Sequence, residues 1–101
     1  MLINIIKTYR TVVAVCDKGL IGKKFEEGLL QLDVKENFYK GEEGKEVSHE
    51  EAVELMISFS NEDATFNIVG SRAVKAALEA GVIDKESVKK VQKIPYGLSL
   101  M

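Results

Sequence analysis

The sequence predicts one compact α/β (α+β) domain over residues 1–101, with a mixed sheet of about five strands, an N-terminal β-hairpin and two to three helices mainly on one face. Two apolar segments of strand character follow each other directly at the N-terminus, which predicts the hairpin. Strand-like and helical segments then alternate, which is typical of a sheet covered by helices. A chain of 101 residues is long enough for one hydrophobic core and too short for two.

The first third of the chain is expected to supply three strands. Residues 2–9 and 10–17 are joined by a tight turn, and the second segment is apolar on both faces, as a central strand is. Residues 29–34 alternate apolar and polar side chains, which indicates a half-buried strand. Between these strands we expect one helical turn over residues 21–26, and after them a polar, glycine-containing loop over residues 35–46.

Two helices and a strand are expected next. Ser48 and Glu51 form an S-x-x-E capping box, and the apolar side chains of residues 49–60 recur at i, i+3, i+4 and i+7, as on one face of a helix. A fourth strand is expected over residues 65–69. It leads into a second helix over residues 72–80, which a glycine ends.

The C-terminal segment is expected to add a short helix and a last strand. Asp84 is a suitable N-cap, and Val88 and Val91 share one helical face. Pro95 then ends the helix, because it cannot donate a backbone hydrogen bond. Residues 97–101 are expected to close the sheet as a strand.

The composition is that of a globular protein, with 46% hydrophobic and 30% charged residues. The single cysteine, Cys16, has no disulfide partner and is expected to be a small buried hydrophobe in a reducing compartment. No segment approaches the roughly 20 apolar residues that a membrane span requires, and the N-terminal residues do not resemble a signal peptide. We therefore expect a cytoplasmic protein without a membrane partner.

The charge is distributed unevenly along the chain. Residues 1–25 carry +4, residues 26–63 carry −9 and residues 70–101 carry +3, which gives the net charge of −2. If the two basic ends of the chain pack together, they form a surface that attracts a polyanion. The candidate nucleic-acid-binding residues are Lys18, Lys23, Lys24, Lys89, Lys90 and Lys93. Because no catalytic constellation stands out, the first hypothesis is a non-enzymatic, translation-associated module that binds RNA or a ribonucleoprotein.

The segment from Gly70 to Arg72 supports a second hypothesis. A helix N-terminus presents unpaired amides and partial positive charge to a phosphate or carboxylate, and Arg72 could add a bidentate contact. Ser71 is also a good N-cap, so helix capping alone explains its presence. The alternative is therefore a small anion- or nucleotide-binding protein, possibly enzymatic, with a site formed by Asn67, Gly70, Ser71 and Arg72.

Two further features favour structural interpretations. His49 lies among carboxylates, but no other metal ligands stand at fixed spacing, so we expect a surface histidine, no metal site and no cofactor. Residues 19–22 resemble the G-x-x-G loop of KH domains, but their central Leu20 and Ile21 are apolar, which favours a simple turn. A third hypothesis is a homo-oligomer or complex subunit that uses an exposed strand edge. The oligomeric state does not follow from the sequence.

Ordered sequence blocks resemble a small archaeal family catalogued as domain of unknown function 424. The blocks are VVAVCDKGLIGKKFEEGLLQLDV, FY.G and NIVGSRAV, followed by a helix that ends in GVID, and they span nearly the whole chain. The resemblance implies an archaeal, cytoplasmic, small α/β protein without an established activity, and it transfers no catalytic residue. Tails in this family often carry proline followed by histidine, whereas Tyr96 follows Pro95 here.

Overall fold

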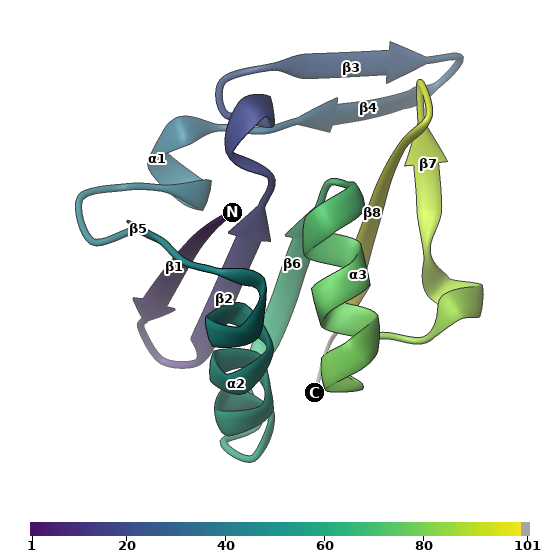
Figure 1. Ribbon diagram of the computed structural model, residues 1–101. Coiled ribbons are helices and arrows are strands. Elements are labelled where there is room, and N and C mark those ends of the chain that lie inside the picture. The colour runs from purple at the N-terminus through teal and green to yellow at the C-terminus, as the bar shows by residue number, and fades with distance from the viewer. Residues whose placement is uncertain (100–101) are drawn as a thin grey trace.

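The computed structural model describes residues 1–99 (Figure 1). The strands are β1 (Leu2–Lys7), β2 (Thr11–Cys16), β3 (Lys24–Glu27), β4 (Leu30–Asp33), β5 (Lys45–Glu46), β6 (Thr65–Val69), β7 (Lys89–Val91) and β8 (Ile94–Ser99). The helices are α1 (Glu36–Tyr39), α2 (His49–Ser60) and α3 (Ser71–Ala80), with 3-10 turns η1 (Lys18–Leu20) and η2 (Lys85–Ser87).

The centre of the fold is a six-stranded mixed sheet in the order β5-β1-β2-β6-β8-β7. β2 and β6 are parallel neighbours, and the other strand pairs of this sheet are antiparallel. β3 and β4 form a separate hairpin. The predicted α+β class, the mixed sheet and the N-terminal hairpin are confirmed, with six strands in the sheet rather than about five.

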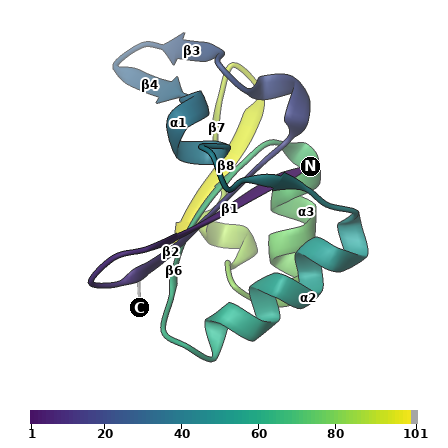
Figure 2. The same cartoon turned by 90° about the vertical axis from the view of Figure 1, so that its left-hand side faces the viewer.

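α2 and α3 lie side by side on one face of the sheet (Figures 1 and 2). Because side chains alternate along a strand, every second residue of β1, β2 and β6 points toward these helices. The buried residues of this layer include Ile3, Val13, Val15, Phe66 and Ile68 from the strands and Ala52, Met56, Ala73 and Ala77 from the helices. Burying a side chain such as Phe66 or Met56 contributes roughly 1.5–3 kcal/mol.

The opposite face is covered in part by α1 and the β3–β4 hairpin (Figure 2). Its buried residues are Leu2, Ala14, Cys16, Leu32, Val34, Tyr39, Val69 and Val91. Cys16 is fully buried, as predicted. In the described part of the chain, no helix is long and apolar enough to cross a membrane.

The start of α2 and the end of α3 follow local sequence rules. The capping box at α2 is confirmed: the N–H of Glu51 donates to Ser48 Oγ and the N–H of Ser48 donates to Glu51 Oε1, each at 3.1 Å. Gly81 ends α3 in the left-handed conformation, with φ of 76°. α2 therefore begins at its predicted N-cap, and α3 ends at its predicted C-terminal glycine.

Two expectations for residues 21–46 are wrong. Residues 21–26 do not form a helical turn, because β3 begins at Lys24 and pairs with β4. The 3-10 turn η1 lies before this segment. The segment 35–46 is not a continuous loop. It contains α1, which buries Tyr39, and β5, which pairs with the start of β1.

The expected third helix is also wrong. After η2 the chain forms β7, which pairs with β8 through a tight turn where Gln92 and Lys93 have φ of 49° and 68°. Pro95 lies inside β8 rather than at a helix end, and its carbonyl accepts a 2.8 Å hydrogen bond from the N–H of Gly70. The last strand thus begins earlier than expected, and residues 100 and 101 of the predicted strand lie outside the described residues.

Candidate functional site

The candidate site lies where the parallel strands β2 and β6 end side by side. Cys16 and Val69 are register partners at this end, and Asp17 and Gly70 follow them directly. In open α/β sheets, ligands bind beyond the carboxyl ends of parallel strands. α3 begins at this point, so its N-terminus faces the same end of the molecule as η1 (Figure 1).

Asp17 caps the N-terminus of α3. Its Oδ1 accepts a 2.8 Å hydrogen bond from the N–H of Ala73, and its Oδ2 accepts one of 3.2 Å from the N–H of Arg72. Ser71 was expected to be the N-cap, which is wrong: Gly70 holds that position and Ser71 is the first helical residue. The Asp17 carboxylate therefore accepts hydrogen bonds from two of the helix N-terminal amides that were expected to bind an external anion.

Gly70 makes room for this cap. Its φ is 109°, a region that side-chain-bearing residues rarely adopt, and a Cβ at this position would lie 2.4 Å from Asp17 Cγ. The glycine of the NIVGSRAV block is thus explained by the close approach of the Asp17 carboxylate, which follows β2. A phosphate loop is not required to explain it.

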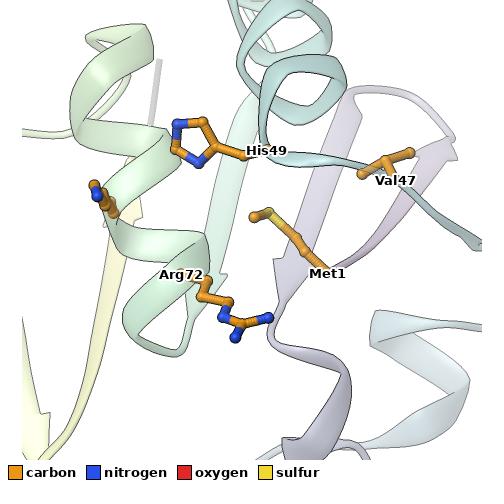
Figure 3. Close-up of a pocket in the computed structure, with 5 residues that line it drawn as sticks. Met1, Val47, His49 and Arg72 are labelled. Carbon is orange, nitrogen blue, oxygen red and sulfur yellow. The ribbon is translucent and has the colours of Figure 1, made fainter.

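The side chain of Arg72 enters a pocket between the N-terminal ends of α2 and α3 (Figure 3). This Arg72 pocket has a volume of about 370 Å³ and is lined by Met1, Val47, His49, Arg72 and Lys75. Arg72 and Lys75 are three residues apart on α3, a spacing that places two side chains on the same helical face. His49 is the first residue of α2, so the pocket combines basic side chains from two helices.

The basic groups of the Arg72 pocket differ in their partners. His49 Nε2 lies 2.5 Å from Glu79 Oε2, so the imidazole is held by a carboxylate of α3. Within residues 1–99, neither Arg72 nor Lys75 has a carboxylate oxygen within 4.0 Å. Two exposed cations without an acidic partner make this pocket suitable for an anion.

Asn67 does not belong to this pocket. Its neighbours Phe66 and Ile68 are buried beneath α2 and α3, and side chains of a strand alternate between the two faces. Asn67 therefore points to the opposite face of the sheet, where it is half-buried. Of the four residues predicted to form the anion site, the structure brings Gly70, Ser71 and Arg72 together and separates Asn67 from them.

The six candidate nucleic-acid-binding lysines are all exposed. Lys18 Nζ donates a 3.0 Å hydrogen bond to Glu46 Oε1. This hydrogen bond and the charge of Lys18 lower the pKa of the Glu46 carboxyl. The remaining five residues have no carboxylate oxygen within 4.0 Å in the described chain: Lys23, Lys24, Lys89, Lys90 and Lys93.

The candidate lysines form two groups along the chain, one in residues 18–24 and one in residues 89–93. The fold brings these two groups to one end of the molecule. The β3–β4 hairpin lies beside β7, and the N–H of Gln92 donates to Glu27 Oε1 at 2.7 Å (Figure 1). Acidic residues are interleaved there, since Asp33 faces Lys24 across the hairpin. This end of the molecule therefore has mixed charge.

The pocket adds two basic residues, His49 and Lys75, that the predicted site lacked. Lys75 could have been found from its i, i+3 spacing to Arg72, whereas the approach of His49 depends on how α2 packs against α3. His49 was predicted to be a surface histidine, and in the structure it is half-exposed. Among residues 1–99 no three histidine, cysteine or acidic side chains are grouped as a metal site.

The fold and this pocket define a small α+β protein with two features. Asp17, which follows β2 of the parallel β2–β6 pair, caps α3, and a basic pocket lies on the surface. The chain belongs to the family described as "Protein of unknown function (DUF424)", whose model matches residues 6–98. It is similar to an uncharacterized conserved protein from Methanopyrus kandleri, whose crystal structure superposes with a TM-score of 0.79 at 22% identity. The similarity covers 96% of this chain and 87% of that one, and it shows the fold alone. No curated protein sequence matches this chain significantly.

Proposed function

We propose that this protein is a non-enzymatic module that binds the phosphate backbone of RNA, with one phosphate held in the Arg72 pocket. The observation that supports this proposal is the pair of basic side chains, Arg72 and Lys75, with no carboxylate partner within 4.0 Å in residues 1–99. The proposal includes a ribonucleoprotein as the partner and a translation-associated role in the cytoplasm. The archaeal source of the structural relative is consistent with an archaeal origin.

The chemistry of the pocket suits a phosphodiester. An arginine guanidinium donates two parallel hydrogen bonds to phosphate oxygens, and a lysine adds a point charge beside it. His49 lines the same pocket but is engaged with Glu79, so its contribution is secondary. The α3 amides take no part in the proposed binding, because Asp17 already accepts from two of them.

The exposed lysines extend the proposed surface. Lys93 lies at the β7–β8 turn and Lys24 at the start of β3, and these elements lie at the end of the molecule where α3 begins (Figure 1). Each phosphate that a lysine neutralises releases condensed counterions. An RNA that passes from the Arg72 pocket across this end would therefore bind with a strong dependence on salt.

The test is fluorescence anisotropy with a short, labelled single-stranded RNA between about 50 and 200 mM salt. We expect affinity to fall steeply with salt, and the Arg72→Ala variant to bind about tenfold more weakly, as expected for loss of a charged hydrogen bond. Arg10→Ala is the matched control, because Arg10 lies at the exposed β1–β2 turn. Absence of binding at the lowest salt concentration, or equal losses in both variants, would contradict the proposal.

A free nucleotide shares the phosphate chemistry and could occupy the same pocket. Thermal unfolding with saturating ATP, or with inorganic phosphate, distinguishes this source of phosphate from RNA. A rise in Tm that depends on Arg72, combined with no RNA binding, would replace the RNA proposal by the alternative of a small nucleotide-binding protein. RNA binding without such a rise would support the RNA proposal.

A further inference from the structure

Strand β1 has an open edge along four of its six residues. β5 pairs only with Leu2 and Ile3, so residues 4–7 have β2 as a neighbour on one side and no strand on the other within residues 1–99. Figure 2 looks onto this side of the molecule and shows the β1–β2 hairpin extending beyond β5. A strand edge of this kind presents unpaired N–H and C=O groups.

The direction of these groups follows from one hydrogen bond. The carbonyl of Met1 accepts from the N–H of Val47 at 2.8 Å, so it points toward the β5 side. Backbone groups of alternate residues in an antiparallel strand point to opposite edges. The N–H and C=O groups of Ile5 and Lys7 therefore point outward beyond the end of β5, whereas those of Ile6 point toward β2.

A groove runs beside this open edge. This β1-edge groove has a volume of about 470 Å³, and its lining consists of three apolar and three charged side chains: Ile3, Ile5, Phe59, Lys7, Glu43 and Lys45. Ile5 and Phe59 are partly buried and pack against the core beneath α2. The groove thus offers an apolar floor directly next to unpaired backbone groups.

We propose that the open edge of β1 binds an extended peptide segment of another protein as an additional strand. Main-chain hydrogen bonds to Ile5 and Lys7 would provide affinity, and side chains on one face of the peptide would provide specificity. Because side chains on one face are two residues apart, an apolar residue beside Ile5 places the next side chain of that face beside Lys7. The partner segment therefore carries an apolar residue and a carboxylate separated by one residue. This surface is separate from the Arg72 pocket.

The charges of the groove favour an acidic partner over a second copy of this chain. The Nζ of Lys7 lies 6.0 Å from the Phe59 ring centroid and has no carboxylate oxygen within 4.0 Å in residues 1–99. Edge-to-edge pairing of two copies would bring a second Lys7 alongside the first, and like charges on adjacent strands repel. Glu43 repels a second carboxylate at the β5 end of the groove, so one acidic residue on the Lys7 side fits best.

The first test measures binding of a labelled peptide, Thr-Thr-Val-Thr-Glu-Thr-Thr, by fluorescence anisotropy. We expect the Lys7→Glu variant to bind it at least about tenfold more weakly, and a peptide with lysine in place of glutamate to restore binding to that variant. Arg10→Glu makes the same charge change at the β1–β2 turn and is expected to have little effect. Equal effects of the two variants, failure of the charge swap, or no binding of the peptide would each overturn the proposal.

A second measurement follows the backbone. Hydrogen exchange by NMR should show that the peptide slows exchange of the Ile5 and Lys7 amides and leaves that of Ile6 unchanged. The Arg72→Ala variant should bind the peptide normally, so that failure of this proposal and failure of RNA binding are distinguishable. Sedimentation that shows a dimer dissociated by the peptide would instead assign the edge to a second copy and overturn the proposal.

Discussion

Asp17 Oδ1 accepts a 2.8 Å hydrogen bond from the backbone N–H of Ala73, which lies 56 positions further along the chain. Oδ2 of the same carboxylate accepts from the N–H of Arg72 at 3.2 Å. One side chain thus joins the end of β2 to the start of α3 and satisfies two amides that a helix otherwise leaves unpaired. It also fixes the backbone of Arg72 at the edge of the Arg72 pocket.

Replacing Asp17 by alanine should destabilise the fold. The variant loses a helix cap and a negative charge at a helix N-terminus, which together correspond to roughly 1–2 kcal/mol of the free energy of unfolding. Urea denaturation measures the loss. Asp33→Ala serves as the control, because Asp33 is an exposed acid on β4. Equal losses in the two variants would show that the Asp17 cap contributes nothing specific.

Gly70→Ala should also be destabilising, and the effect should depend on Asp17. Alanine is strained at a φ of 109°, and its Cβ would lie 2.4 Å from Asp17 Cγ. We therefore expect the free energy of unfolding to fall by about 1–3 kcal/mol. In the Asp17→Ala background the contact is absent, so the cost of Gly70→Ala should be smaller. Gly22→Ala is the control, since Gly22 has φ of 80° with no atom within 4 Å of an added Cβ. Strict additivity in the double-mutant cycle would rule out the proposed contact.

Local sequence patterns were sufficient for the elements with strong caps or long periodicity. The Ser48–Glu51 box is a contact between neighbours in the chain, so α2 could be predicted from sequence alone. The N-terminal hairpin and β6 are apolar segments bounded by polar or glycine residues, and they also form as expected.

The elements that were predicted wrongly are short, and tertiary pairing determines them. Val88 and Val91 have a helical spacing, but Val91 pairs with Ile94 in a hairpin instead. The turn uses Gln92 and Lys93 at positive φ, where glycine or asparagine is usual, so the sequence contains no turn signal. Tertiary pairing also overrides the helical turn expected over residues 21–26, because residues 24–26 pair with β4 as part of strand β3.

The candidate site could be predicted only in part. Arg72 was predicted as an anion-binding residue because it lies at a helix N-terminus, where an arginine can add a bidentate contact to a bound anion. Asp17 was missed because nothing in its local sequence indicates a contact with residues more than 50 positions away. The separation of Asn67 from Arg72 likewise requires the sheet, in which Asn67 points away from the helices.

The free energy of unfolding should fall at high pH. Burial, with the charge of Asp17 beside it, raises the pKa of the Cys16 thiol from 9.0 to about 12. Burial, with Cys16 nearby, raises the pKa of the Tyr39 hydroxyl from 10.0 to about 12. The unfolded chain releases both protons at lower pH than the folded chain, so the stabilisation is complete below pH 9 and is lost as pH rises toward about 12.

Tyr39→Phe tests the tyrosine share of this dependence. Urea denaturation across this pH range should give a shallower decline for Tyr39→Phe than for the wild type, because the variant has no hydroxyl to ionise. Tyr9→Phe is the control, since Tyr9 is 102% exposed at the β1–β2 turn. An unchanged pH profile in Tyr39→Phe would show that the buried hydroxyl does not contribute.

The lysines should contribute to RNA binding according to their existing partners. Lys93→Ala removes a cation without a carboxylate within 4.0 Å in residues 1–99, so it should reduce the slope of log affinity against log salt by about one. Lys18→Ala removes a cation that Glu46 already pairs at 3.0 Å, so its effect on the slope should be smaller. Anisotropy titrations at several salt concentrations measure both slopes. A larger effect of Lys18 than of Lys93 would place the RNA near β5 and contradict a path across the β7–β8 turn.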